Sequence, residues 1–311
     1  MGLRNSTRRM IFVATAGVVL AALVWWACVR PDLFESASPA SAVERSAASR
    51  IITLAPNSAE IICALGAGDR VVGVSKFCVY PPELSGKARV GGLFDPNLER
   101  IAGLQPDLVV LRGGNPEVEQ LCKERGVAVF HDPTERLADI EDCIRDLADL
   151  VGAVENGAEL IRRHNDRIEM IRQRVTGLPK PRVFVTVSRN PAELSNILTT
   201  GRSTFLGEMI ELAGGVNVFG DIDIDYPQVT PEEILTRRPD IIIELMPETK
   251  LTDSMRDRVI RQWVELGSMP AVERQRIHFI TESNALIPSP RYVEIMDRVS
   301  HILHPPASSH P

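Results

Sequence analysis

An internal repeat constrains the fold of this chain more than any other feature of its sequence. Residues 97–110 and 230–243 share one pattern: a short mixed segment, a Pro-Asp turn and a run of aliphatic residues. Each copy predicts a short helix followed by a buried strand, because an unbroken aliphatic run is typical of a parallel strand covered on both faces. The aligned positions are Glu99 and Glu232, Ile101 and Ile234, and Pro106-Asp107 and Pro239-Asp240.

A second pair of matching segments precedes the first pair. Residues 57–68 and 202–215 each begin with polar side chains, continue as an apolar helix and end in glycines. Asn57 and Glu60 have the spacing of a capping box, and glycine commonly ends a helix. Two matching pairs in the same order predict two lobes built on a common plan.

Both lobes alternate short aliphatic strands with helices, which predicts an α/β fold with Rossmann-like parallel sheets. The predicted strands are 51–54, 71–74, 108–111 and 127–130 in the first lobe, and 183–187, 241–245 and 278–280 in the second. Ligands of such sheets bind beyond the carboxyl ends of the strands. The candidate binding residues at those ends are Pro56, Asn57, Ser58, Arg112, Asn115, Arg189 and Ser283.

A single long amphipathic helix is predicted between the lobes, over residues 153–176. Its apolar residues recur every three or four positions, and a helix of this length spans roughly 36 Å, enough to reach across both lobes. The predicted organisation is an N-terminal segment over 1–30, a linker over 31–49, a lobe over 50–150, the bridge over 151–178, a second lobe over 179–305 and a tail over 306–311.

The N-terminal segment predicts export of the body. Residues 10–29 carry no charge, follow Arg8-Arg9 and precede Arg30. Twenty apolar residues are long enough to cross a bilayer and longer than most secretory signals. We favour an uncleaved signal anchor, with a cleaved signal or a lipoprotein signal ending at Cys28 as alternatives. The linker is rich in Ser and Ala and shows no apolar periodicity, as expected of a tether.

Composition and motif content exclude several classes of function. The net charge is −6 with no basic run in the body, so nucleic-acid binding is not expected. The six histidines are scattered, and no metalloprotease, nucleophile-elbow or phosphate-loop motif occurs. We therefore expect no enzyme activity, no catalytic residues, no resident cofactor and no metal site. Cys63, Cys78, Cys122 and Cys143 either form disulfides outside the cytoplasm or are merely buried.

The body resembles the substrate-binding proteins of ABC importers for cobalamin and ferric siderophores. The resemblance covers about residues 50–300 and is closest to the cobalamin-binding branch. The matching motifs are Arg50–Pro56, Glu60, Leu65-Gly66, Val71–Ser75, Tyr80-Pro81-Pro82, Asn97–Ile101, Pro106-Asp107, Arg112–Asn115, Ala213–Gly215, Asn217, Pro227–Val229, Glu232 and Ser289-Pro290-Arg291.

This resemblance implies the class III binding-protein fold, two lobes bridged by one helix, and a corrinoid held between them. It implies a periplasmic monomer, or one on the outer face of the membrane, which delivers its ligand to a permease dimer with ATPase subunits. A ferric siderophore or haem is the alternative ligand, and a membrane-tethered sensor without a permease is the alternative role.

The resemblance also assigns roles to particular residues. Glu99 and Glu232 stand at the positions that meet arginines of the permease, unless they are ordinary first-turn acids. The positions of Tyr80, Phe94, Tyr226 and Ser283 imply ligand contacts. Arg112, Arg189 and Arg202 are candidates for the carboxylates or catecholates of a siderophore, or for the amides and phosphate of a corrinoid, unless they are solvated loop residues.

Overall fold

The computed structural model describes residues 47–306, which lie in one compact unit that begins at Ala47. The predicted anchor over residues 10–29 and all but the last three residues of the predicted linker fall outside the described residues. Within the described part, no helix has both the length and the apolar character required to cross a bilayer. Ala48 and Ser49, which we placed in the linker, bond to Leu150 and Asp107 of the body.

The first sheet is parallel throughout, as predicted, with the strand order β3-β2-β1-β4-β5. Its strands are β1 (Ile51–Thr53), β2 (Val71–Val74), β3 (Ala88–Arg89), β4 (Leu108–Arg112) and β5 (Ala128–Asp132). The accompanying helices are α2 (Pro56–Ala64), α3 (Leu98–Gly103), α4 (Pro116–Arg125) and α5 (Leu137–Leu150), with short 3-10 turns η2 (Gly68–Arg70) and η3 (Pro82–Gly86).

The second sheet is also parallel, with the order β11-β10-β6-β8. Its strands are β6 (Arg182–Thr186), β8 (Val216–Asn217), β10 (Ile241–Leu245) and β11 (Ile277–Ile280), and β7 (Ile197–Leu198) pairs with β9 (Gln228–Val229) as a small antiparallel ribbon. The accompanying helices are α7 (Phe205–Leu212), α8 (Pro231–Arg237), α9 (Asp253–Leu266), α10 (Pro270–Glu273) and α11 (Tyr292–Leu303).

Successive side chains of a strand point to opposite sides of a sheet, and the aliphatic strands pack into a hydrophobic core on each side. Ile241 and Ile243 of β10 join a core shared with α6 and α11, whereas Ile242 packs with Phe184 and Trp263 on the opposite face. Ile51 and Ile52 of β1 divide in the same way. The shared core contains residues of both sheets, so the two lobes are packed against each other.

The sequence repeat corresponds to a repeated set of hydrogen bonds. The Asp107 carboxylate accepts a bond from the Arg50 backbone N–H at 3.0 Å, and Asp240 accepts one from the Arg182 N–H at the same distance. The Arg50 and Arg182 guanidinium groups each donate to carbonyls at the end of the helix that precedes the turn. Each Pro-Asp turn thus ties a helix end to the start of a neighbouring strand.

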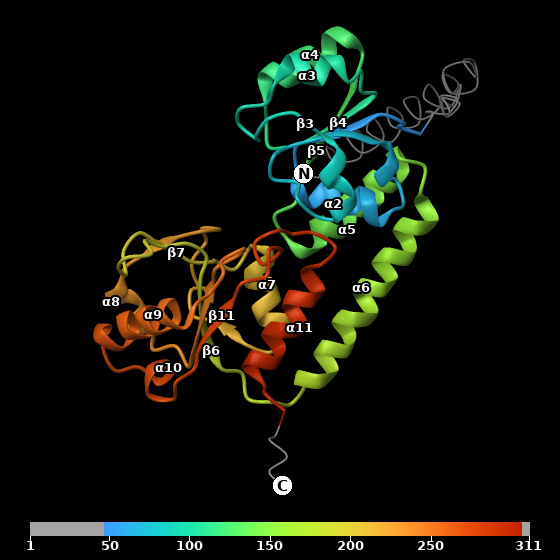
Figure 1. Cartoon of the computed structure of the whole chain (residues 1–311). Coiled ribbons are helices and arrows are strands. Elements are labelled where there is room, and N and C mark those ends of the chain that lie inside the picture. The colour runs from blue at the N-terminus through green and yellow to red at the C-terminus, as the bar shows by residue number, and fades with distance from the viewer. Residues whose placement is uncertain (1–46, 307–311) are drawn as a thin grey trace, which may run out of the picture. The chain divides into compact units, whose positions relative to one another are not determined.

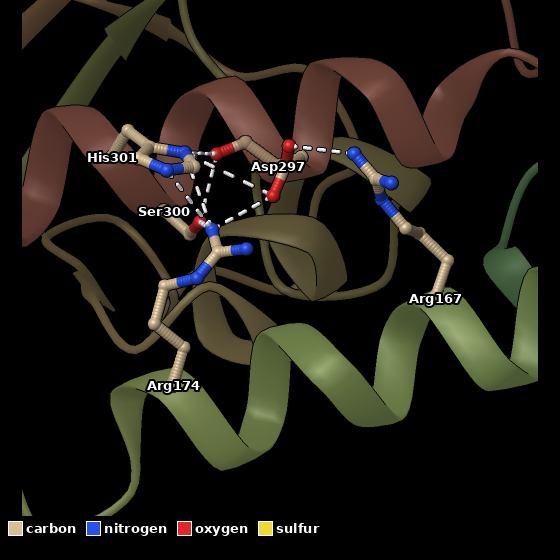
Figure 2. A network of polar contacts seen from close by, with 5 residues as sticks. All are labelled: Arg167, Arg174, Asp297, Ser300 and His301. Carbon is tan, nitrogen blue, oxygen red and sulfur yellow. Dashed lines mark hydrogen bonds and ion pairs between the residues drawn. The ribbon is translucent and has the colours of Figure 1, made fainter.

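The bridge is α6 (Val154–Val175), and Figure 1 shows it as one uninterrupted helix. It packs against α5 of the first lobe and against α7 and α11 of the second. Its second half is fixed by charge: Arg167 and Arg174 donate to the two oxygens of Asp297 on α11 at 2.8 and 2.7 Å, as Figure 2 shows. The helix predicted over 153–176 is therefore confirmed to within one residue at each end.

The four cysteines in the described residues are unpaired. Cys78, Cys122 and Cys143 are buried and Cys63 is half-buried. Burial raises the pKa of each thiol above its ordinary value. They therefore behave as small apolar core residues, which is the second of the two readings left open by the sequence.

Candidate functional site

The carboxyl edges of the two sheets meet through contacts between their following loops. The Phe205 N–H, at the start of α7, donates to the carbonyl of Glu135, which follows β5, at 2.8 Å. Arg136, the next residue along, pairs with Glu208 of α7 at 2.6 Å. Because ligands of parallel sheets bind beyond the carboxyl ends of strands, a site between the lobes is available to both sheets.

Glu60 and Arg291 form the most enclosed of these contacts. Glu60 lies on α2 and is 4% exposed, and Arg291 immediately precedes α11 in the second lobe. The guanidinium donates to both carboxylate oxygens, at 2.8 and 2.6 Å. The ring of Tyr80, 40% exposed, lies against the same guanidinium, whose carbon is 3.6 Å from the ring centroid. Tyr80 therefore lies at the junction of the lobes with part of its ring accessible.

The start of α2 differs from the sequence expectation. Ala55 is the N-cap and Pro56 opens the helix, so Asn57 and Glu60 do not form a capping box. The Asn57 amide and the Ser58 hydroxyl donate instead to the buried carboxylate of Asp132 at the end of β5. Both side chains are buried, and their donors are directed to Asp132 within the first lobe. We leave them out of the proposed ligand set, whereas Pro56 is half-buried at the strand end.

Arg112 and Tyr226 lie close together at the end of β4. Arg112 Nη2 donates to Glu135 at 3.2 Å, while its buried Nη1 has no hydrogen-bond partner among the described residues. Burial and the neighbouring Glu135 raise the pKa of Tyr226 to about 12, against the opposing influence of Arg112. The phenol is therefore neutral at physiological pH and retains its donor. Asn115, by contrast, caps α4 by accepting from the Val118 N–H at 3.1 Å.

The second lobe contains a cavity of about 350 Å³ between the carboxyl ends of β6 and β10. Arg189 lines it, but its side chain is only 6% exposed and is paired with Glu244 at 3.1 Å. Trp263 Nε1 donates to the same carboxylate at 2.7 Å. Burial raises the pKa of Glu244, and the Arg189 charge and the Trp263 hydrogen bond oppose that shift. Arg189 is thus committed to an internal ion pair and is not a free anion-binding group.

The remaining candidates lie apart from these contacts. Phe94 is 91% exposed, Arg202 is exposed, and Ser283 is half-buried after β11. Glu99 and Glu232 are exposed in the first turns of α3 and α8, and neither forms an ion pair with a described residue. Among residues 47–306, no group of three or more His, Cys, Asp and Glu residues is arranged to hold a metal ion.

The partners of several site residues were not predicted from the sequence. Glu244 is the one acid in the predicted aliphatic strand 241–245, and a carboxylate in a buried strand requires a cationic or hydrogen-bonding partner. That signal was present in the sequence, and the structure identifies the partners as Arg189 and Trp263. Glu135 pairs with Arg112, and Glu60 pairs with Arg291. The partners in each pair lie far apart in the chain, and no local sequence pattern indicates either pair.

Residues 51–283 match the model of the family described as periplasmic binding protein. The vitamin B12-binding protein of Vibrio cholerae is 29% identical over 255 residues, covering 81% of this chain and 88% of that protein. Its counterpart in Vibrio parahaemolyticus is 30% identical over 245 residues, covering 78% of this chain and 84% of that protein.

Solved structures give the same picture of the fold. The periplasmic vitamin B12-binding protein of Vibrio cholerae superposes with a TM-score of 0.68 at 28% identity, covering 82% of this chain and 96% of that one. A periplasmic haem-binding protein from Roseiflexus superposes with a TM-score of 0.66 at 26% identity, covering 83% and 98%. The two parallel sheets and the bridging helix are thus the class III binding-protein fold.

Proposed function

The chain belongs to the periplasmic binding protein family, and on that premise we propose that it binds a corrinoid between its lobes and delivers it to a permease. Membership makes it the substrate-binding component of an ABC importer, acting in the periplasm with a permease and its ATPase subunits as partners. The corrinoid, the residues that hold it and the attachment to the membrane are the parts that we propose.

One structural observation carries the proposal: the carboxyl edges of both sheets meet at loops from the two lobes. Glu60 pairs with Arg291 across this junction beside Tyr80, and Arg112 pairs with Glu135 near Tyr226. A binding protein needs a site with walls on two bodies, because ligand contacts can then be made and released as the bodies move slightly.

The chemistry of these side chains suits a corrinoid. Its peripheral amides and phosphate accept hydrogen bonds, and the unpartnered Nη1 of Arg112 and the neutral phenol of Tyr226 are donors. Tyr80 offers an exposed aromatic face for an apolar ring system. The reported relatives with the highest sequence identity, 28–30%, are vitamin B12-binding proteins, which favours the same ligand class. Haem is the second candidate, because the Roseiflexus haem-binding protein is similar and a propionate would also suit Arg112.

Calorimetry separates these ligands. The full chain, held in lipid nanodiscs, is titrated with cyanocobalamin, cobinamide, haemin and a ferric catecholate siderophore. We expect saturable binding of at least one corrinoid, tighter than that of the iron compounds. R112Q should weaken it about tenfold, as the loss of one charged hydrogen bond predicts, whereas R125Q at the exposed end of α4 should not. Binding of haemin or the siderophore without any corrinoid would overturn the ligand assignment.

Docking to the permease is proposed to use Glu99 and Glu232. They occupy equivalent positions of the repeat, each in the first turn of a short helix, and both are exposed. A permease built from two like subunits presents the same surface twice, and a repeated acid on the two lobes matches it.

Attachment to the membrane is proposed for residues 10–29, with Cys28 lipidation and signal cleavage as the competing outcomes. Mass spectrometry of the mature protein distinguishes them, because an intact N-terminus, a cleaved one and a lipid-modified Cys28 differ in mass. A cleaved and unmodified product recovered free of the membrane would overturn the anchor.

A further inference from the structure

The cavity in the second lobe lies where the topology of its sheet creates a crevice. The order β11-β10-β6-β8 places β8 on one side of β6 and β10 on the other, so the chain leaves β6 and β10 in opposite directions. A crevice opens at such a switch point outside the strand ends, and it is the usual ligand position in open parallel sheets. The cavity of about 350 Å³ lies there, within the lower range of small-molecule sites.

The lining of this cavity is mainly apolar. Its volume suits a bicyclic ring or a branched chain, and the two methionines allow the walls to adapt, because an unbranched thioether side chain changes shape at low cost. The apolar lining residues include Val187, Pro191, Leu245, Met246, Met255 and Leu286.

The charges at the inner end of the cavity cancel. Arg189 and Glu244 are both buried and paired with each other, and Trp263 supplies a further hydrogen bond to the carboxylate. An occupant with a charge at this inner end would therefore find no free counter-ion there, and the cost of removing its charge from water would stand uncompensated. The exposed Arg258 also lines the cavity, so a charge directed outward would meet a cation. The cavity thus selects against charged groups at its inner end.

The Thr186 hydroxyl in the cavity lies near the Glu244 carboxylate without a well-aligned hydrogen bond. Thr186 is 1% exposed and pairs in register with Glu244, yet its hydroxyl makes no well-aligned hydrogen bond with any described residue. A buried hydroxyl without a partner costs free energy, and a bound group with one hydrogen-bonding atom would recover it.

We propose that this cavity binds an uncharged, apolar ring or branched group carrying one hydrogen-bonding atom, and that the group is an arm of the transported ligand. The second half of this statement rests on the proposed function, whereas the first half is a property of the cavity alone. The two halves therefore need separate measurements.

The first measurement uses 2-naphthol as the probe and 2-naphthoate as its charged counterpart. The full chain is labelled with ¹³C at the methionine methyl groups, and Met246 and Met255 report the cavity while the exposed Met170 on α6 serves as reference. We expect saturable shifts at Met246 and Met255 with 2-naphthol and none at Met170. In the variant R258Q, which removes the exposed cation of the lining, we expect at least tenfold weaker binding of 2-naphthoate than of 2-naphthol. Absence of these shifts, or equal binding of the two probes by R258Q, would overturn the cavity assignment.

Variants localise the effect. V187W and, at the exposed mouth, P191W fill the cavity and should abolish the shifts, whereas V264W makes the same change on the exposed side of α9 and should not. T186V keeps the volume and removes the hydroxyl, so it should weaken 2-naphthol binding about threefold or more. If either filled variant that remains folded binds the probe as V264W does, the cavity is not the site.

The second measurement links the cavity to the transported ligand. Saturating cyanocobalamin should displace 2-naphthol, and P191W should lower cyanocobalamin affinity about tenfold. Simultaneous binding of both would overturn the assignment of the cavity to an arm of the ligand. If the chain binds no corrinoid at all, the proposed function fails in calorimetry while the methyl shifts still decide the cavity.

Discussion

The Glu60 carboxylate and the Arg291 guanidinium form a two-point ion pair that joins the lobes, with donor–acceptor distances of 2.8 and 2.6 Å. The side chains are 4% and 15% exposed. The pair therefore sits where water does not screen it, and the Tyr80 ring covers the guanidinium. This contact sets the distance between α2 and the start of α11, and so the geometry of the site between the lobes.

E60Q should destabilise the protein by about 3–5 kcal/mol, because it leaves the Arg291 charge buried without a counter-ion. Urea unfolding monitored by tryptophan fluorescence measures the free energy. The double variant E60Q/R291Q should recover part of the loss, since both charges are then absent. E159Q removes an exposed carboxylate paired with Arg162 on α6 and should leave the free energy of unfolding nearly unchanged. A loss in E60Q no larger than that in E159Q would contradict this role.

The architecture was largely predictable because it depends on patterns that are local in the chain. Unbroken aliphatic runs indicated β4 and β10, and regular spacing indicated α6. The repeat linked the two lobes, and the matched turns at Asp107 and Asp240 give it a structural basis: the equivalent carboxylate holds the same kind of strand start in each lobe.

The site was less predictable because its side chains are defined by distant partners. Asn57 and Ser58 have polar side chains at a strand end, which made them ligand candidates, but Asp132 takes up their donors. Arg189 was a ligand candidate for the same reason, and Glu244 neutralises it. Position at a strand end indicates the neighbourhood of a ligand, whereas burial decides which side chains remain free to meet it.

The double variant E99A/E232A should impair uptake while leaving ligand affinity unchanged, because both acids are exposed on short helices away from the strand ends. Each rim contact contributes modestly, about 0.2–1 kcal/mol, so the single variants should be milder than the double. Ligand affinity of the free protein and ATPase stimulation of its permease are measured together. E117A, an exposed first-turn acid of α4 outside the repeat, is the control.

Two outcomes of that experiment are decisive. Weaker ligand binding by E99A/E232A would place these acids in the ligand site. Full ATPase stimulation by the double variant would make them ordinary first-turn acids that stabilise the helix dipole.

The bridge predicts a small movement on ligand binding. From residue 158 to residue 175 α6 contains neither Gly nor Pro, and Arg167 and Arg174 hold its second half to Asp297. Since a helix bends sharply only at identifiable breaks, the radius of gyration from X-ray scattering should change by at most about 1 Å with cyanocobalamin. D297N should enlarge that change, because it weakens the attachment of α6 to α11. A large compaction of the unaltered protein would contradict a rigid bridge.

Stability should fall with decreasing pH because of one histidine on the bridge. His164 of α6 is 5% exposed, its ring lies edge-on to Tyr292 of α11 at 5.4 Å, and its Nδ1 has no partner among the described residues. Burial and the nearby Arg163 lower the pKa of His164 to about 4, although a hydrogen bond to the Pro290 backbone acts in the opposite direction.

An unfolded histidine has a pKa of about 6.5. Between these values the unfolded chain binds a proton that the folded chain rejects, so the contribution of His164 is present above pH 6.5 and is lost as the pH falls toward 4.

The expected loss attributable to His164 between pH 7.5 and pH 5 is about 2 kcal/mol in the free energy of unfolding, from linkage between the two pKa values. Urea titrations at both pH values measure it. H164Q removes the titrating group while keeping a donor for the Pro290 carbonyl, so its stability should depend on pH less steeply by that amount. H131Q changes an exposed histidine of β5 and should retain the slope of the unaltered protein. Equal slopes for H164Q and H131Q would show that the imidazole at position 164 titrates alike in the folded and unfolded chains, and that the contact between α6 and α11 does not exclude the charged ring.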